Sequence, residues 1–266
     1  MISVLQSANG FFDYNANGSF SKTLAFSSSI SSTSMLVVMV STFDSSNGTT
    51  LNIPTDTLLN TYTLQVSETG NPTDGVSDNI GIISAIYMAP DSGLGSNTVT
   101  ISGTQTGGSA SGTVVTAVIL EVAGMGSAPT LNSHNVAAAS TTFPPSGPTL
   151  NPTVASSIAV ANYAYFGVGN NQPCAAGTGW TLDGATQAAG NLVPPGGGSI
   201  FPNLGGEHQI LSSSSALTCQ MSNPSFFMKA WLSCACNFVP GSGGGGGSST
   251  SDFLGVALSS RNPARF

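Results

Sequence analysis

Residues able to carry acid–base or nucleophilic chemistry are few in this chain and lie far apart. There are two histidines, His134 and His208, and eleven Asp+Glu in 266 residues. His208 follows Glu207 in an expected strand, and His134 lies in a proline-rich connection. The nucleophile elbow, the zinc-protease helix, the phosphate-binding loop and the dinucleotide fingerprint are all missing from the sequence. We therefore assign no catalytic residue and expect a non-enzymatic protein.

Carboxylates leave a glycosidase as a third hypothesis, because that chemistry needs only two of them. Any two of the eleven acids could supply the pair, and no spacing selects among them; examples are Glu68, Glu121, Asp183 and Glu207. A zinc site needs three or four ligands, which only a distant combination of both histidines and a cysteine could provide. Asp74, Asp78 and Asn79 do not have the spacing of an EF-hand loop. We expect neither a metal nor a cofactor.

All four cysteines lie in the C-terminal part: Cys174, Cys219, Cys234 and Cys236. Cys234 and Cys236 share one face of an expected strand, so they cannot easily bond to each other. Antiparallel pairing of 216–221 with 226–238 would bring Cys219 close to them. Two interpretations stay open: Cys219 and Cys174 each bond to one member of the Cys-X-Cys pair, or all four remain thiols.

Aromatic residues give the best case for a binding module. Trp180 and Trp231 could stack on sugar rings, and low charge suits neutral glycans. Aromatic residues on strands also belong to cores, which is the competing interpretation. Tyr163 and Tyr165 lie on one face of the expected strand 158–168 and Phe166 on the other, which indicates packing on both sides.

The composition excludes several classes of partner. Charged residues make up 6% of the chain, against ~25% in ordinary globular proteins, and the formal net charge is −7. Four Lys+Arg cannot neutralise a nucleic-acid backbone or an anionic membrane surface. The longest strongly apolar run, 34–40, is far shorter than a membrane span. The first residues contain no basic region typical of a secretory signal.

The periodicity predicts strands almost everywhere. Segments 62–66, 97–102, 114–122 and 158–168 are rich in β-branched and aromatic residues and end in turn formers. No segment has helical spacing of apolar residues with charged residues on the other face. The expected fold is an all-β antiparallel sandwich, jelly-roll-like and a single domain over 1–240. Further expected strands cover 3–6, 20–26, 36–41, 80–88, 179–182, 208–211, 216–221 and 226–238.

The proline-rich stretch 128–157 is expected to be a long surface connection, since proline removes ladder donors. Neither half of the sequence is an evident copy of the other, so we interpret this stretch as a crossover within one sandwich. A boundary between two small β domains is the alternative. A second surface loop is expected at 188–206.

Four segments carry a resemblance: 60–68 (NTYTLQVSE), 86–102, 118–125 (VILEVAGM) and 176–184 (AGTGWTLDG). In this order they resemble a family of uncharacterised β-sandwich modules of bacterial surface proteins and tailed-phage virion proteins. Glu121 and its neighbours depart from the aromatic corner of that pattern, and the tail has no counterpart in it. The resemblance covers about 2–238 and implies a fold and an exposed setting.

The C-terminal tail indicates assembly. A Gly/Ser linker at 241–251 precedes an arm at 252–266 that holds both arginines of the chain. We expect this arm to dock on neighbouring copies of the chain or on a capsid or surface-layer protein. The predicted docking residues are Phe253, Leu254, Val256, Leu258, Arg261, Arg265 and Phe266.

These features favour a structural protein on the virion surface, most simply a phage capsid decoration (cement) protein. The alternative is a carbohydrate-binding adhesin or fibre module of a phage or bacterial surface, located extracellularly or on the cell.

Overall fold

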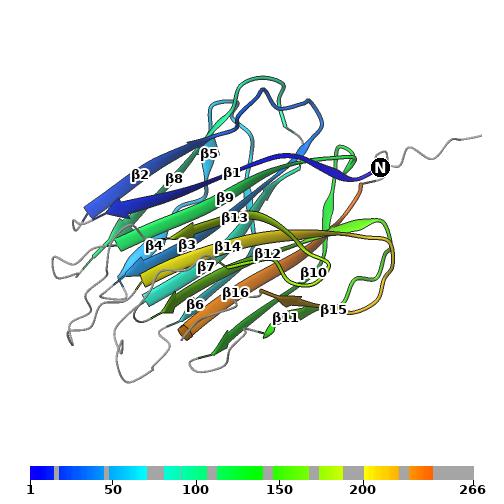
Figure 1. Ribbon diagram of the computed structural model, residues 1–266. Coiled ribbons are helices and arrows are strands. Elements are labelled where there is room, and N and C mark those ends of the chain that lie inside the picture. Colours follow the sequence, from blue (N-terminus) through cyan, green and yellow to red (C-terminus); the bar gives the residue numbers. More distant parts are fainter. Residues whose placement is uncertain are drawn as a thin grey trace, which may run out of the picture.

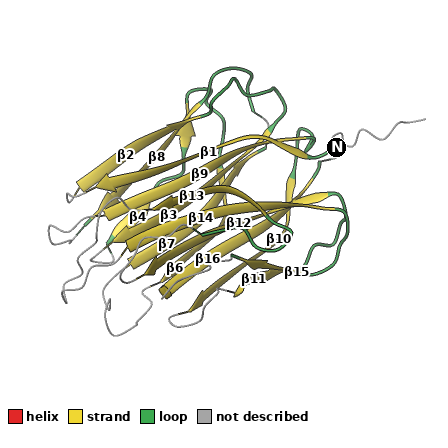
Figure 2. Cartoon of the chain, viewed as in Figure 1, coloured by secondary structure: helices red, strands yellow, loops and turns green. Residues whose placement is uncertain are grey.

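Every regular element in the described part of the chain is a β-strand. The computed structural model describes residues 1–14, 18–44, 48–70, 81–90, 92–106, 113–139, 146–167, 174–187, 201–221 and 228–241 (Figures 1 and 2). The all-β prediction is therefore confirmed. The strands up to residue 123 are β1 (Ser3–Tyr14), β2 (Gly18–Ala25), β3 (Met35–Asp44), β4 (Thr49–Leu51), β5 (Thr55–Asp56), β6 (Thr63–Gly70), β7 (Gly81–Ala89), β8 (Thr98–Gln105) and β9 (Thr113–Ala123). The later strands are β10 (Thr130–Ala139), β11 (Ser146–Leu150), β12 (Ser157–Gly167), β13 (Thr181–Gln187), β14 (Phe201–Leu211), β15 (Leu217–Gln220) and β16 (Met228–Val239).

The strands form two large sheets and two smaller ones. The first large sheet has the order β1-β9-β3-β7-β6, and the second has the order β10-β16-β12-β14-β13. A smaller sheet, β2-β8-β4 with β5 beside β8, belongs to the first half, and the pair β11-β15 belongs to the second. All pairings are antiparallel.

The two halves repeat one topology. Replacing β1, β9, β3, β7 and β6 by β10, β16, β12, β14 and β13 converts the first large sheet into the second. The same replacement matches β2-β8 with β11-β15. In each half the chain crosses from the large sheet to the smaller one and back more than once. The sandwich prediction is confirmed, and the repeat that the sequence does not show is one of strand order.

The large sheets pack face to face, so the molecule has four layers and three apolar cores. Alternate residues of β3 point in opposite directions: Met35, Val37 and Met39 face the core between the large sheets. The residues between them, such as Leu36 and Val38, face the core under β2-β8-β4. A third core lies between the second large sheet and β11-β15. Burial on both faces explains why the apolar run 34–40 is continuous rather than alternating.

A buried amide joins the two large sheets. Asn162 of β12 is fully buried, and its Nδ2 donates to the Val40 carbonyl at 3.0 Å and to Oγ of Ser41 at 3.1 Å. It also lies 2.9 Å from Oγ of Ser84 on β7. Polar groups in an apolar core are stable only when paired, so this cluster sets how one half docks on the other.

The expectation that 128–157 is a plain surface connection is wrong. β10 and β11 lie within it, and β10 is an edge strand of the second large sheet. Pro148 stands where the register of β11 against β15 shifts, which is where an edge strand accommodates proline. The expected loop 188–206 is also partly strand, because β14 begins at Phe201, and 188–200 lies outside the described residues.

The two ends of the described chain lie together. Gly124, in the connection between β9 and β10, lies directly against the Met1 carbonyl. Gly241 donates from its amide nitrogen to the carbonyl of Met125 at 2.9 Å. Gly241, the last described residue, therefore lies beside Met1 and beside the link between the two halves (Figure 1).

Candidate functional site

Ionisable side chains concentrate on β13 and β14. Nδ1 of His208 lies 2.7 Å from Oδ1 and 2.8 Å from Oδ2 of Asp183. Asp183 occupies the register shift between Leu182 and Gly184, where an additional residue in the strand re-aims its side chain. The sequence placed these two residues in different segments and did not bring them together.

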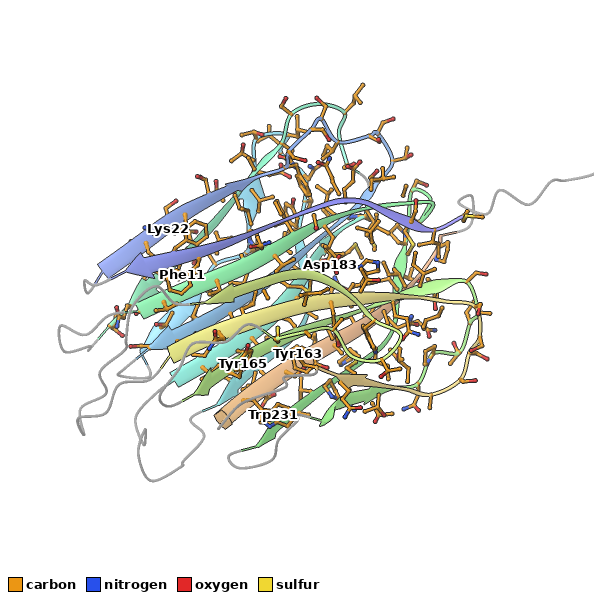
Figure 3. The ribbon with its side chains drawn as sticks, in the orientation of Figure 1. Phe11, Lys22, Tyr163, Tyr165, Asp183 and Trp231 are labelled. Carbon is orange, nitrogen blue, oxygen red and sulfur yellow. The ribbon has the colours of Figure 1, made fainter. Side chains whose placement is uncertain are left out.

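The Asp183–His208 pair is nearly buried at the junction of the two halves. Asp183 is 9% exposed and His208 8%. Oγ of Ser7, on β1, donates to the Asp183 backbone carbonyl at 3.2 Å (Figure 3, where Asp183 is labelled). Burial raises the pKa of Asp183, and His208 opposes that rise by hydrogen bonding and by charge.

This pair has the orienting half of an acid–base device. A carboxylate on Nδ1 sets the ring position and leaves Nε2 as the working nitrogen. Within the described residues no hydroxyl or thiol is hydrogen-bonded to Nε2 of His208. The contacts seen are those of a hydrogen-bonded His–Asp pair that ties β13 to β14.

Glu207 points to the opposite face of β14, as strand alternation requires. It is 1% exposed, and its Oε2 accepts a hydrogen bond from the Gly177 amide at 3.0 Å. Burial, above all, raises the pKa of Glu207 to about 7, and the negative charge of Asp183 adds to the rise. The Gly177 amide, the Tyr163 hydroxyl and the charge of His208 act in the other direction.

The surroundings of Glu207 are densely filled. The space between these side chains is too small for a water molecule. Burial raises the pKa of the Cys174 thiol to about 12, and the Glu207 charge adds to that rise. In this conformation the cluster cannot admit a substrate. Its lining residues are Tyr163, Cys174, Leu182, Gly205, Glu207 and Met221.

Glu121 is a structural carboxylate. It is 1% exposed and accepts hydrogen bonds from Nε2 of Gln6 at 2.7 Å, the Ser31 amide at 2.6 Å and Oγ of Ser34 at 2.9 Å. These donors fix the connection between β2 and β3 against β1. Where the resembling modules have an aromatic residue, this chain therefore has a carboxylate that accepts several hydrogen bonds.

Asp56 organises another end of the first half. Its carboxylate accepts bonds from the Leu58 and Asn60 amides, from the side-chain amides of Asn60 and Asn97, and from the Tyr62 hydroxyl at 2.8 Å. Burial alone would raise the pKa of Asp56, but these hydrogen bonds outweigh it and the pKa is lowered. Neutral donors, rather than cations, hold this carboxylate.

Of the two interpretations left open for the cysteines, the structure agrees with the second, because all four are free and buried. Cys234 and Cys236 share a face, as predicted, and pack in the core between the large sheets. Cys219 and Cys174 lie in the third core, on the other side of the second large sheet. The strand that holds Cys219, β15, pairs with β11 and not with β16, so the expected strand pairing was wrong.

The tryptophans are not available for glycan stacking. Trp180 is 7% exposed and Trp231 3%, and both pack in the third core with Tyr163 and Tyr165 (Figure 3). The two-sided packing inferred for 158–168 explains this, because one face of β12 meets these rings.

The remaining candidate residues lie either on described strands or outside the described residues. His134 is exposed on β10, and Glu68 is half-buried on β6. Asp74, Asp78 and Asn79 lie outside the described residues, as do the linker after Gly241 and the docking residues Phe253, Leu254, Val256, Leu258, Arg261, Arg265 and Phe266. No group of three or more His, Cys, Asp and Glu within the described ranges could hold a metal ion.

The outer face of β2-β8-β4 is uncharged and hydroxyl-lined. Outward positions of β2 hold Ser19, Ser21 and Thr23, paired with Thr104, Ser102 and Thr100 of β8. On the far side of β8, the hydroxyl groups of Thr50 and Thr104 are hydrogen-bonded at 2.7 Å. This face is suited to uncharged partners.

The searches for relatives complete these observations. The described residues include no helix of the length and apolarity that a membrane crossing requires. Comparisons with protein-family models, curated proteins and solved structures found no match to this chain.

Proposed function

We propose that this protein is a non-enzymatic structural protein of a virion surface that acts through assembly contacts, as a capsid decoration (cement) protein does. The observation that carries the proposal is the four-layer block, in which both large sheets are buried on both faces. Such a block offers outer faces and edges for contact with neighbours. The virion setting rests on the resemblance of the four segments named above.

The use of the buried carboxylates supports a structural role. The carboxylates of Glu121 and Asp56 accept hydrogen bonds from residues of the connecting loops. Asp183 is hydrogen-bonded to His208 at the junction of the two halves. Polar networks of this kind make one conformation unique, which suits a part that must fit a lattice.

Attachment is assigned to the arm 252–266. Gly241 fixes the start of the linker on the body through its bond to Met125. The eleven linker residues 241–251 reach ~18 Å as a coil, or ~36 Å if extended. The apolar residues of the arm would fill a groove or extend a sheet edge of a neighbour, and Arg261 and Arg265 would pair with its carboxylates. Many copies make weak contacts firm through effective concentration.

The experiment compares the full chain with a variant in which Arg261 and Arg265 are both replaced by Glu. We expect self-association, followed by light scattering after gel filtration, to weaken strongly and to lose its salt dependence. Replacement of both arginines by Lys is the matched control and should retain most of the association. Equal association of all three proteins would contradict the docking role.

Carbohydrate binding is the second candidate. The buried tryptophans remove its predicted platform, but the hydroxyl-lined outer face of β2-β8-β4 suits a neutral glycan. A glycan array separates the two: reproducible binding that is lost on Thr100→Lys would favour this candidate over assembly.

A further inference from the structure

The surroundings of Glu207 leave polar atoms without partners. Oε1 of Glu207 and the hydroxyl oxygen of Tyr163 are both buried, and neither has a hydrogen-bond partner of good geometry among the described residues. Oε2 has one donor, the Gly177 amide. Water cannot enter to make up the deficit. The Gly177 amide and the Tyr163 hydroxyl favour the carboxylate, but burial outweighs both, and a neutral carboxylic acid can itself donate.

Most titratable groups around Glu207, on either face of the sheet, do not compensate a negative charge. Tyr163 comes from β12, Cys219 from β15, Cys174 from the turn before β13, and Asp183 from β13. Only His208, the next residue on β14, favours the ionised form by its charge. No lysine or arginine of the described chain acts on Glu207.

The element that covers Glu207 is a short turn outside the sheet ladders. Within 174–180, the Trp180 amide donates to the Gly177 carbonyl at 3.0 Å, and Gly179 has a φ of +83°. Gly177 lies so close to the Gln220 carbonyl that a Cβ there would overlap it. Ala175 forms a single β-bridge, but the turn belongs to no ladder of β13 or β14, so its separation from β14 leaves those ladders intact.

We infer that Glu207 and the turn 174–180 form a pH-sensitive latch. With Glu207 protonated, the turn stays closed over β14. When Glu207 releases its proton to solvent, the buried charge draws in water, the turn opens and the Cys174 and Cys219 thiols become accessible. This inference concerns local opening and goes beyond the assembly role proposed above.

The size of the effect follows from the proton affinities. The Glu207 pKa is about 7 in the closed state, and the ordinary value of 4.5 applies once the turn is open. The difference corresponds to about 300-fold in the opening equilibrium over the full titration. Between pH about 6 and about 8.5 the opening equilibrium constant rises about tenfold, because the rest of the rise occurs below pH 6.

The test measures alkylation of each cysteine by iodoacetamide and mass spectrometry in the wild-type chain and in Glu207→Gln. Taking the wild-type rate relative to the variant rate at each pH removes the intrinsic pH dependence of the thiol. We expect this ratio for Cys174 to rise about tenfold from pH about 6 to about 8.5. Cys234, in the core between the large sheets, is the internal control, and its ratio should stay constant.

Two outcomes would overturn the latch. A constant ratio for Cys174 would mean that Glu207 does not control the turn. An equal rise for Cys234 would mean that the charge destabilises the whole fold rather than the turn. If Glu207→Gln fails to fold, amide hydrogen exchange of the wild-type chain decides: exchange at 174–180, corrected for its intrinsic pH dependence, must rise over this range while that of β12 does not.

Discussion

Asn162 provides the sharpest test of how the two halves are joined. Replacing Asn162 by Ala removes the amide that contacts the Val40 carbonyl and the hydroxyls of Ser41 and Ser84. Each buried polar group left without a partner costs about 1–3 kcal/mol, and the lost volume adds a cavity. Since both serines are fully buried, we expect a loss of about 3 kcal/mol, a large part of the roughly 5–15 kcal/mol typical of a folded domain.

The assay is urea unfolding followed by fluorescence, analysed for the free energy of unfolding. The control is a double-mutant cycle with Ser84→Ala, which removes one partner of Asn162. We expect the two substitutions together to cost less than the sum of each alone by about 1–2 kcal/mol, since one interaction is removed twice. A loss below about 1 kcal/mol for Asn162→Ala, or strict additivity, would refute the idea that this amide joins the sheets.

Three further outcomes are expected. Asp56→Asn should lower the free energy of unfolding at neutral pH and make it fall less in acid. The lowered pKa of Asp56 stabilises the fold at pH values above 3.8, the ordinary pKa of this group, and that stabilisation is lost as the pH falls. Denaturation at neutral pH and at pH about 3 measures this, and parallel acid profiles of the two proteins would contradict it. Leu59→Gly should leave stability unchanged or raise it by up to ~1 kcal/mol in thermal unfolding, because Leu59 has a φ of +60° and is 88% exposed; a clear loss would show a contact for its side chain. A thiol assay on the unfolded chain without reductant should find all four cysteines reactive, and fewer would mean that disulfides form.

The strands could be predicted from the sequence because their apolar and β-branched runs are long. The apolar run 34–40 predicts a strand, and the structure places residues 35–40 in β3. The two-sided packing of 158–168 could also be predicted, and the structure places Tyr165 in the third core and Ala164 in the core between the large sheets. The order of the layers could not be predicted from the sequence, because it depends on which strands pair although they lie far apart in the chain.

The repeated topology left no sequence trace for a physical reason. A sandwich topology is specified by where strands and turns fall, and many residue choices satisfy the same alternation. The prolines of 128–157 concealed two strands, because edge strands tolerate proline where the ladder is interrupted.

The candidate site was predictable only in part. His208 and Glu207 were noted as neighbours, but alternation sends them to opposite faces of β14, and the partner of His208 is Asp183. The signal that could have found this pair is the Asp183-Gly184 dipeptide, since glycine inside a strand often marks a bulge. For Cys219, the error came from pairing consecutive strands, whereas its strand crosses to β11.

The central claim is that the protein works by assembly through its C-terminal arm, and its mass in solution tests this most directly. Sedimentation equilibrium over a wide concentration range should show the full chain associating into species larger than 26.6 kDa. A chain that lacks 252–266 should remain a monomer with an unchanged unfolding temperature. If both chains sediment as identical monomers at every concentration, or associate equally, the arm does not mediate self-association, and assembly of copies of this chain through the arm is contradicted.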